Sequence, residues 1–206
     1  GHSSAASDVY KRQIYEFTWN DYCDWYVEIA KIRLYGDDPK KADIARAVLI
    51  HVLKGILTLL HPYSPFITEE LWSYFKTKNE NDLIISPWIN GKVLKNEQVF
   101  DSMDLLQQIV TSIRAIRSQL NIPPKKRATV YIANSESFKE MILSFDEAIK
   151  MLAGVNLISF INNEERPSKS ATAVIKNMEL FIPLEGLIDI DLEINHQNNK
   201  ETLIKL

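Results

Sequence analysis

The chain has 206 residues, of which 46% are hydrophobic and 25% are charged, a composition typical of a globular protein with one or two domains. Its six glycines are too far apart to form the glycine-rich phosphate loop of a nucleotide-binding site. A net charge of −3 excludes a uniformly basic nucleic-acid-binding protein, but it leaves room for a local basic patch.

A single cysteine, Cys23, excludes an internal disulfide and a zinc site made from several cysteines. It also favours a reducing, cytosolic setting. The four histidines lack metal-ligand spacing, so we expect no metal site. No apolar run approaches the roughly 18 residues of a membrane span. Residues 1–4 are typical of a tag remnant, and residues 1–7 are expected to be a disordered start.

The first predicted helix covers about residues 8–35, and it has apolar side chains on two faces. Six of the twelve residues 15–26 are aromatic. Two apolar faces are typical of a helix that is buried on two sides inside a bundle. We therefore expect these aromatic residues, Trp25 and Tyr26 included, and the Cys23 thiol in the core.

Two more helices follow. The second begins at Asp38-Pro39, a side-chain cap followed by a proline at the first helical position, and runs to about Leu60. The third covers about residues 65–76. The predicted core face of the second helix comprises Ile44, Val48, His51, Val52, Gly55, Ile56 and Leu59. The apolar residues of the third helix are Phe66, Ile67, Leu71, Trp72 and Phe75.

Residues 77–100 show no sustained periodicity, and Ser86-Pro87-Trp88 is expected to form an ordered loop with an aromatic anchor. A fourth helix is predicted from about Ser102 to Leu120, and Pro123-Pro124 ends it. Its apolar face comprises Leu105, Leu106, Ile109, Val110, Ile113, Ile116 and Leu120.

Beyond Pro124 the periodicity changes. Residues 128–133 and 156–161 are predicted strands on either side of a helix over residues 136–152. Two short strands, 173–175 and 179–183, flank Lys176-Asn177. The predicted fold is therefore mainly α, a helical bundle over residues 8–124 followed by a small α+β domain over 125–190. Residues 191–206 are expected to start a further helix.

No group of residues forms a convincing catalytic centre. Adjacent carboxylates such as Glu69-Glu70 do not face each other on a helix, and Glu164-Glu165 and Asp189/Asp191 are typical of solvated charges. His61 precedes a proline and is expected at a helix end, where it meets free carbonyls. The sequence predicts no catalytic residue.

Basic residues gather in one stretch that contains no acid, and phosphate is the common partner of such a group. An ordinary solvated surface would explain the same stretch. Its residues are Arg114, Arg117, Lys125, Lys126 and Arg127. A weaker group, Lys40, Lys41 and Arg46, is balanced by three nearby aspartates.

Five motifs resemble the valyl-tRNA synthetase family of class I enzymes. WNDYCDWYVEIAK (residues 19–31) and LHPYSPFITEELW (60–72) resemble segments of its anticodon-binding bundle. SPW (86–88), IRAIR with NIPP (113–124), and PLEGLID (183–189) match in the same order. The resemblance implies an anticodon-binding bundle, a small α+β domain, and the start of a coiled-coil arm at residues 191–206.

The resemblance also implies a role in RNA recognition. Lys40, Lys41 and Arg46 would contact the anticodon loop of tRNA(Val), and Arg114, Arg117, Lys125, Lys126 and Arg127 would contact phosphates of the tRNA body. The catalytic signatures of the family are absent. The chain is therefore expected to be inactive alone, with ATP and Mg²⁺ used elsewhere in a cytoplasmic parent enzyme that has no membrane partner.

Two other readings of the sequence stay open. The chain could be the equivalent part of an isoleucyl- or leucyl-tRNA synthetase, although the single Cys23 disfavours the zinc module typical of the isoleucyl enzyme. It could also be a freestanding helical module for protein–protein interaction. For an excised piece of a synthetase, separated from the rest of its chain, we expect an exposed apolar patch or self-association.

Overall fold

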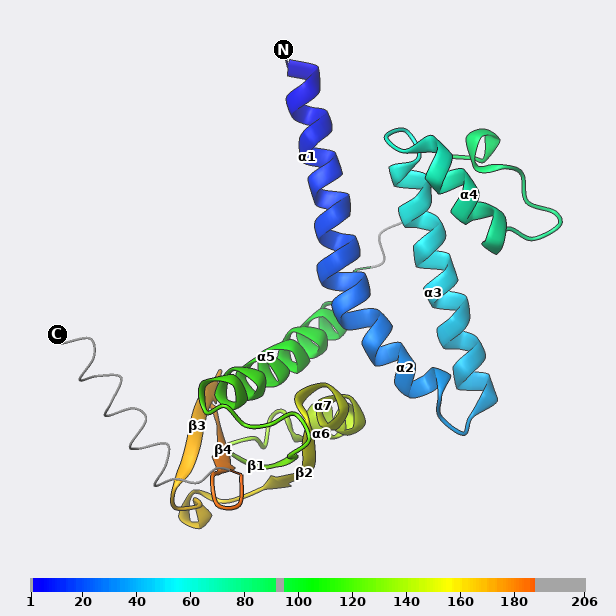
Figure 1. Ribbon diagram of the computed structural model, residues 1–206. Helices are drawn as coiled ribbons and strands as arrows, with labels where there is room; N and C mark the ends of the chain where they lie inside the picture. The colour runs from blue at the N-terminus through cyan, green and yellow to red at the C-terminus, as the bar shows by residue number, and fades with distance from the viewer. Residues whose placement is uncertain (1, 92–94, 188–206) are drawn as a thin grey trace. The chain divides into compact units, whose positions relative to one another are not determined.

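The computed structural model describes residues 2–91 and 95–187. It divides into two compact units, Gly1–Leu94 and Lys95–Leu206 (Figure 1). The first unit is helical, and the second combines helices with a four-stranded sheet. The predicted fold class, a mainly helical protein with a small α+β part, is confirmed. The predicted arm at residues 191–206 and the pair Asp189/Asp191 lie outside the described residues.

The first unit opens with one long helical stretch in three parts, α1 (His2–Glu16), the π-helix η1 (Phe17–Val27) and α2 (Glu28–Leu34). Helix α1 begins at His2, whereas the sequence predicts a disordered start over residues 1–7. Apolar periodicity does not predict the π-helical segment, because the expected spacing assumes the 3.6 residues per turn of an α-helix.

Burial on two sides is also wrong for the first half of this stretch. Tyr15, Phe17 and Trp19 are exposed, Trp19 by 57%. Tyr22 is buried, and its hydroxyl donates a hydrogen bond to the Leu49 carbonyl oxygen at 2.9 Å. Since a π-helix changes the angle between successive side chains, an α-helical count assigns them to the wrong faces.

Helix α3 (Pro39–Leu60) begins as predicted. The Asp38 carboxylate accepts hydrogen bonds from the amides of Lys40 and Lys41 at 3.0 and 3.3 Å. The predicted core face is wrong over its first half, because Ile44, Val48 and His51 are exposed. The buried residues are Ala42, Ala45, Ile56, Leu57 and Thr58. Small alanines let α2 and α3 pack closely, and the larger side chains point away.

Helix α4 (Pro65–Phe75) and the 3-10 turn η2 (Leu83–Ile85) complete the unit. Trp72 packs with Leu57 and Leu83, and its indole nitrogen donates to the Asn81 carbonyl at 3.0 Å. Phe66 is 91% exposed, so it is no core residue, and Ile67 and Leu71 are also exposed. Trp88 is exposed, so the expected aromatic anchor of this loop is wrong, and Leu83 supplies the buried contact instead.

The second unit arranges four strands in the order β2-β1-β4-β3, with β1 and β2 parallel and the other pairs antiparallel. The predicted helix at residues 136–152 is split in two at Phe145. The elements are α5 (Glu97–Gln119), β1 (Ala128–Ala133), α6 (Lys139–Ser144), α7 (Asp146–Ala153), β2 (Val155–Phe160), η3 (Asn163–Glu165), β3 (Ser170–Ile175) and β4 (Met178–Pro183).

The core of this unit lies between the sheet and two helices. Helix α5 packs against α7 and β3, and α7 packs against β2. The predicted apolar face of α5 is confirmed from Leu105 to Ile116, all of its members being buried. The predicted helical bundle extends to residue 124. In the structure, by contrast, the contacts of α5 place this helix in the second unit with the sheet.

Candidate nucleic-acid interface

The first basic group lies on the opening turns of α3. Lys40, Lys41 and Arg46 are all exposed. Arg46 pairs with Asp43 at 2.6 Å, and Lys41 lies 3.9 Å from Asp38. Exposed ion pairs of this kind contribute little to stability, so a phosphate group could replace the carboxylate at small cost. These three side chains are therefore accessible to RNA.

The second basic group has a different environment, because its central member is buried. Arg117 is only 9% exposed. Its guanidinium donates to three carbonyl oxygens, those of Lys126 at 2.8 Å, Gly154 at 3.1 Å and Pro123 at 3.2 Å. Arg117 is thus first of all a structural group, rather than the exposed phosphate contact that the sequence suggested.

Burial and a neighbouring charge act on Arg117 in the same direction. Desolvation lowers the pKa of its guanidinium below the ordinary value, and the charge of Arg127 lowers this pKa further. An arginine stays protonated in proteins, so the group keeps its positive charge. The three carbonyl oxygens therefore have a charged donor, which makes stronger hydrogen bonds than a neutral one.

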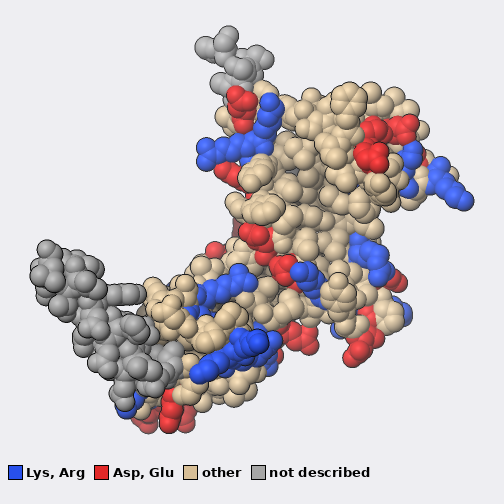
Figure 2. Space-filling view, viewed as in Figure 1, with Lys and Arg blue, Asp and Glu red and all other residues tan. Residues whose placement is uncertain are grey.

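Three neighbouring cations also bind main-chain carbonyl oxygens but remain exposed. Arg114 donates to the Leu152 carbonyl at 2.8 Å, and Arg127 donates to that of Val155 at 3.2 Å. Lys126 donates to the carbonyls of Gly186 and Leu187, both at 3.1 Å. Lys125 is exposed as well. Figure 2 shows Lys and Arg side chains gathered on the visible face of the second unit.

The last turn of α7 explains why the arginines converge here. The final carbonyls of a helix lack amide partners, and they carry partial negative charge. Gly154 ends α7 in the left-handed conformation, with φ of +66°. A Cβ atom at this position would lie 3.2 Å from the Arg117 guanidinium carbon. A glycine is therefore needed both for the backbone and for the space beside Arg117.

Sequence reasoning found these cations but missed their partners. Residues 114–127 contain no Asp or Glu, so no carboxylate within that stretch neutralises the five cations. Carbonyl oxygens have no signature in the sequence, so their convergence could not be foreseen. A partial signal was available in Gly154, the only glycine between residues 92 and 185, which follows a predicted helix.

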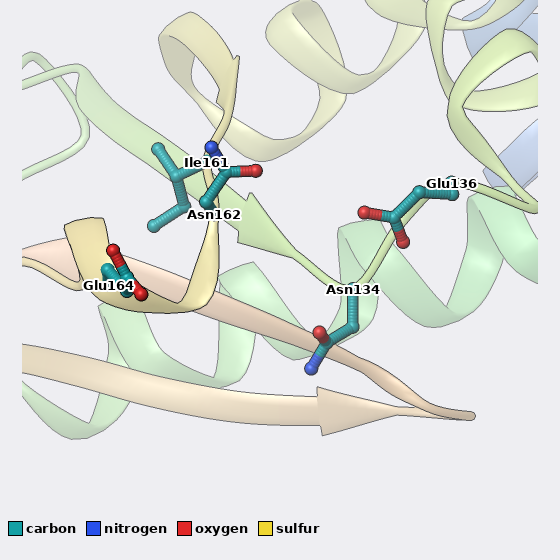
Figure 3. A pocket seen from close by; sticks show the side chains of 5 residues that line it. All are labelled: Asn134, Glu136, Ile161, Asn162 and Glu164. Atoms are coloured by element: carbon teal, nitrogen blue, oxygen red, sulfur yellow. The ribbon is translucent and has the colours of Figure 1, made fainter.

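A hollow in this unit, of about 410 Å³, lies where β1 and β2 end. Figure 3 shows Asn134, Glu136, Ile161, Asn162 and Glu164 around it, with the Glu136 carboxylate directed into the opening. Among the described residues, no group of three or more acidic, histidine or cysteine side chains is placed to hold a metal ion. The carboxylates of Glu136 and Glu164 disfavour a phosphate ligand in this hollow.

The residues considered for catalysis have structural contacts. The Glu69 carboxylate accepts hydrogen bonds from the amides of Leu83 and Ile84 at 2.8 and 3.1 Å, and it thereby fixes η2. His61 ends α3 as expected, and its Nδ1 lies 2.8 Å from the Thr68 hydroxyl oxygen. Cys23 is half-buried. No helix in the described residues is long and apolar enough to cross a membrane.

Comparison with known proteins gives one family match and many relatives. The family described as the anticodon-binding domain of tRNA ligase matches residues 7–132. Valine–tRNA ligase from Geobacillus stearothermophilus is 37% identical over 185 residues, which cover 89% of this chain. The enzyme of the same name from Legionella pneumophila strain Lens is 37% identical over 199 residues, or 93% of this chain.

The relatives are much longer than this chain. The valine–tRNA ligase of Listeria innocua is 40% identical over 190 residues, but these residues cover only 21% of it. The chain spans 21–22% of the length of the Geobacillus and Legionella proteins too. The similarity therefore concerns about a fifth of each relative.

Proposed function

Because the chain belongs to the anticodon-binding domain family of tRNA ligases, we propose that it is the tRNA-binding part of a valine–tRNA ligase. The observation that carries this proposal is the match of residues 7–132 to that family, joined by similarity to valine–tRNA ligases over most of the chain. The names of these relatives favour valine over isoleucine or leucine as the amino acid of the parent enzyme.

The proposed mechanism is recognition of RNA, without bond formation in this part of the enzyme. The exposed cations at the start of α3, Lys40, Lys41 and Arg46, bind phosphates of the anticodon loop. The exposed members of the second group, Arg114, Lys125, Lys126 and Arg127, bind phosphates of the tRNA body. Such remote contacts position the acceptor end for reaction elsewhere in the enzyme.

The whole enzyme is proposed to attach valine to tRNA(Val) in the cytoplasm, with ATP and Mg²⁺ as co-reactants. No described residue is assigned to either of these. The remainder of the synthetase chain is the proposed protein partner.

Titration of the chain with valine tRNA and with a non-cognate tRNA, over a range of salt concentrations, tests the proposal. Binding should weaken steeply as salt rises, because phosphate contacts release counterions. Lys40→Gln/Lys41→Gln should lower the affinity for the anticodon stem-loop about tenfold and reduce the salt slope by about one to two.

The matched control is Lys78→Gln/Lys139→Gln, which removes the same charge from exposed positions outside both basic groups. It should leave the affinity within about twofold of the unmodified chain. Equal losses in the two double variants would show that only net charge matters and would contradict the anticodon contact.

A further inference from the structure

The C-terminal ends of α5 and α7 meet at a hollow of about 530 Å³. We call it the α5–α7 groove and define it by Arg114, Arg117, Ser118, Pro123, Pro124 and Met151. All of these residues belong to the second unit. The volume lies within the range of small-molecule pockets, roughly 300–1,000 Å³, and suffices for one nucleotide.

The charge of the groove favours an anion. Two guanidinium groups line it, and none of the described residues in its wall is Asp or Glu. Helix C-termini are partly negative, but the last carbonyls of α7 accept hydrogen bonds from these same guanidinium groups. The hollow at the ends of β1 and β2 carries Glu136 and Glu164 and would repel a phosphate.

The remaining wall of the groove is aliphatic. Pro123, Pro124 and Met151 are all exposed to some extent, and Ile122 and Ala153 lie behind them. An exposed apolar surface of this kind can cover one face of a nucleobase, with Met151 adapting its shape to the base, and unstacked bases also lie against the planes of arginine guanidinium groups. Ser118 and Asn121 supply hydrogen-bonding groups beside it.

We propose that the α5–α7 groove holds one unstacked nucleotide of the bound RNA. Its base lies against Met151 and the two prolines, and its phosphate is bound by Arg114. The inference rests on the proposed function, because it names a site for the RNA that this chain would bind. Arg117 has a positioning role, because its hydrogen bonds to the carbonyls of Pro123 and Lys126 fix the segment that carries the prolines.

The decisive variant fills the groove without changing its charge. Ser118→Phe places a ring in the hollow, whereas Gln119→Phe places the same ring on the adjacent exposed residue, which does not line the groove. Ser118→Phe should weaken binding of valine tRNA about tenfold with an unchanged salt slope. Gln119→Phe should have little effect. Arg114→Gln should reduce the slope by about one.

A direct readout uses the methionine methyl groups. With ¹³C-methyl methionine, a ten-nucleotide single-stranded RNA should shift the Met151 signal and leave that of Met178 unmoved, since Met178 is buried in the sheet. Inorganic polyphosphate, which has charge but no base, should bind Ser118→Phe and Gln119→Phe equally well.

The outcomes separate the two proposals. If tRNA binds, but equally to Ser118→Phe and Gln119→Phe and without a Met151 shift, the groove proposal fails and the tRNA function stands. If valine tRNA does not bind while the short RNA shifts Met151, the groove stands and the proposed function fails. If neither RNA produces binding or a shift, both are overturned.

Discussion

Arg117 illustrates how the environment of a single residue redefines a basic sequence motif. In the sequence it is one of five cations with no acid among them. In the structure its guanidinium joins carbonyl oxygens of Pro123, Lys126 and Gly154, which come from two separate segments. Much of the charge of this basic group therefore also holds the second unit together, and its exposed members are the ones accessible to a ligand.

Replacing Arg117 should destabilise the second unit. Arg117→Lys keeps the charge but cannot reach three carbonyls, so buried acceptors would lose their donor. We expect the free energy of unfolding to fall by about 2–4 kcal/mol, measured by urea denaturation. Arg46→Lys, at an exposed ion pair, is the control and should change this free energy by less than about 0.5 kcal/mol. Equal losses would contradict the role of Arg117.

Gly154 and Gly186 offer a matched comparison at residue scale. Both have positive φ, +66° and +75°. A Cβ on Gly154 would meet the Arg117 guanidinium, whereas one on Gly186 would have nothing within 4 Å. Gly186→Ala should therefore lower the free energy of unfolding only through backbone strain, by about 1 kcal/mol.

Gly154→Ala should destabilise by about 1–2 kcal/mol more than Gly186→Ala, because it adds the displacement of Arg117. Thermal unfolding of the two variants provides the measurement. If both substitutions lower stability equally, the space beside Arg117 is not needed.

At the scale of elements, a charged contact joins the middle of α3 to the loop after α4. The Lys54 ammonium donates to both carboxylate oxygens of Glu80, at 2.6 and 2.7 Å, and the Thr77 amide donates to Oε2 at 2.6 Å. Lys54 also lies over the Trp72 ring, 5.1 Å from its centre. The hydrogen bond from Lys54, then that from Thr77, lowers the pKa of Glu80 from 4.5 to about 2.

A pH dependence of stability follows from this lowered pKa. The carboxylate favours folding while it is ionised, so its contribution is complete above pH 4.5 and is lost as the pH falls toward about 2. Glu80→Gln should lower the melting temperature at about pH 6, and the difference from the unmodified chain should narrow toward about pH 3. A difference that does not change with pH would contradict the assignment.

The sequence predicts elements well where local chemistry decides them. The Asp38 cap, the proline that follows it and the strand from Ala128 to Ala133 all agree with the structure. The exposed face of α3 could not be predicted, because alanines that allow close helix packing carry less hydrophobic signal than Ile44 and Val48 do. The π-helix η1 could not be predicted for a different reason. Its backbone hydrogen bonds join residues five apart, and that spacing requires no characteristic residue types.

At the scale of the whole molecule, the first unit exposes large apolar side chains on α1, η1 and α4. Phe66, Ile67 and Trp19 are each more than half exposed. The sequence predicts an apolar surface, but it assigns the aromatic residues of η1, Trp19 among them, to the core. Which face a helix buries depends on its neighbours, and one chain's periodicity cannot show whether both apolar faces are covered.

This surface should cause the separate chain to self-associate. In sedimentation velocity, the unmodified chain should show a mass that rises with concentration, and Phe66→Gln/Ile67→Gln should reduce that rise. Thr77→Gln/Lys78→Gln, at exposed polar positions, should leave it unchanged. A monomer at all concentrations, with no binding of an apolar dye, would contradict this expectation.

The candidate interface was predictable in part. The exposed cations Lys40, Lys41 and Arg46 lie together because they share the first turns of one helix, and sequence spacing shows that. The α5–α7 groove joins residues 114–124 with residues 151–154, and only the packing of α5 on α7 creates it. A groove built from segments this far apart has no counterpart in a linear motif.

Two carbonyl oxygens beneath Arg117 each have a second donor, and this has a consequence for hydrogen exchange. The Lys126 amide donates to Pro123, and the Ala128 amide donates to Gly154, at 3.0 and 3.1 Å. These are carbonyls that Arg117 also contacts. Release of the guanidinium would therefore loosen both amides at once. Their deuterium uptake should share one opening free energy, so that residues 117–128 and 154 unfold as a single cooperative unit.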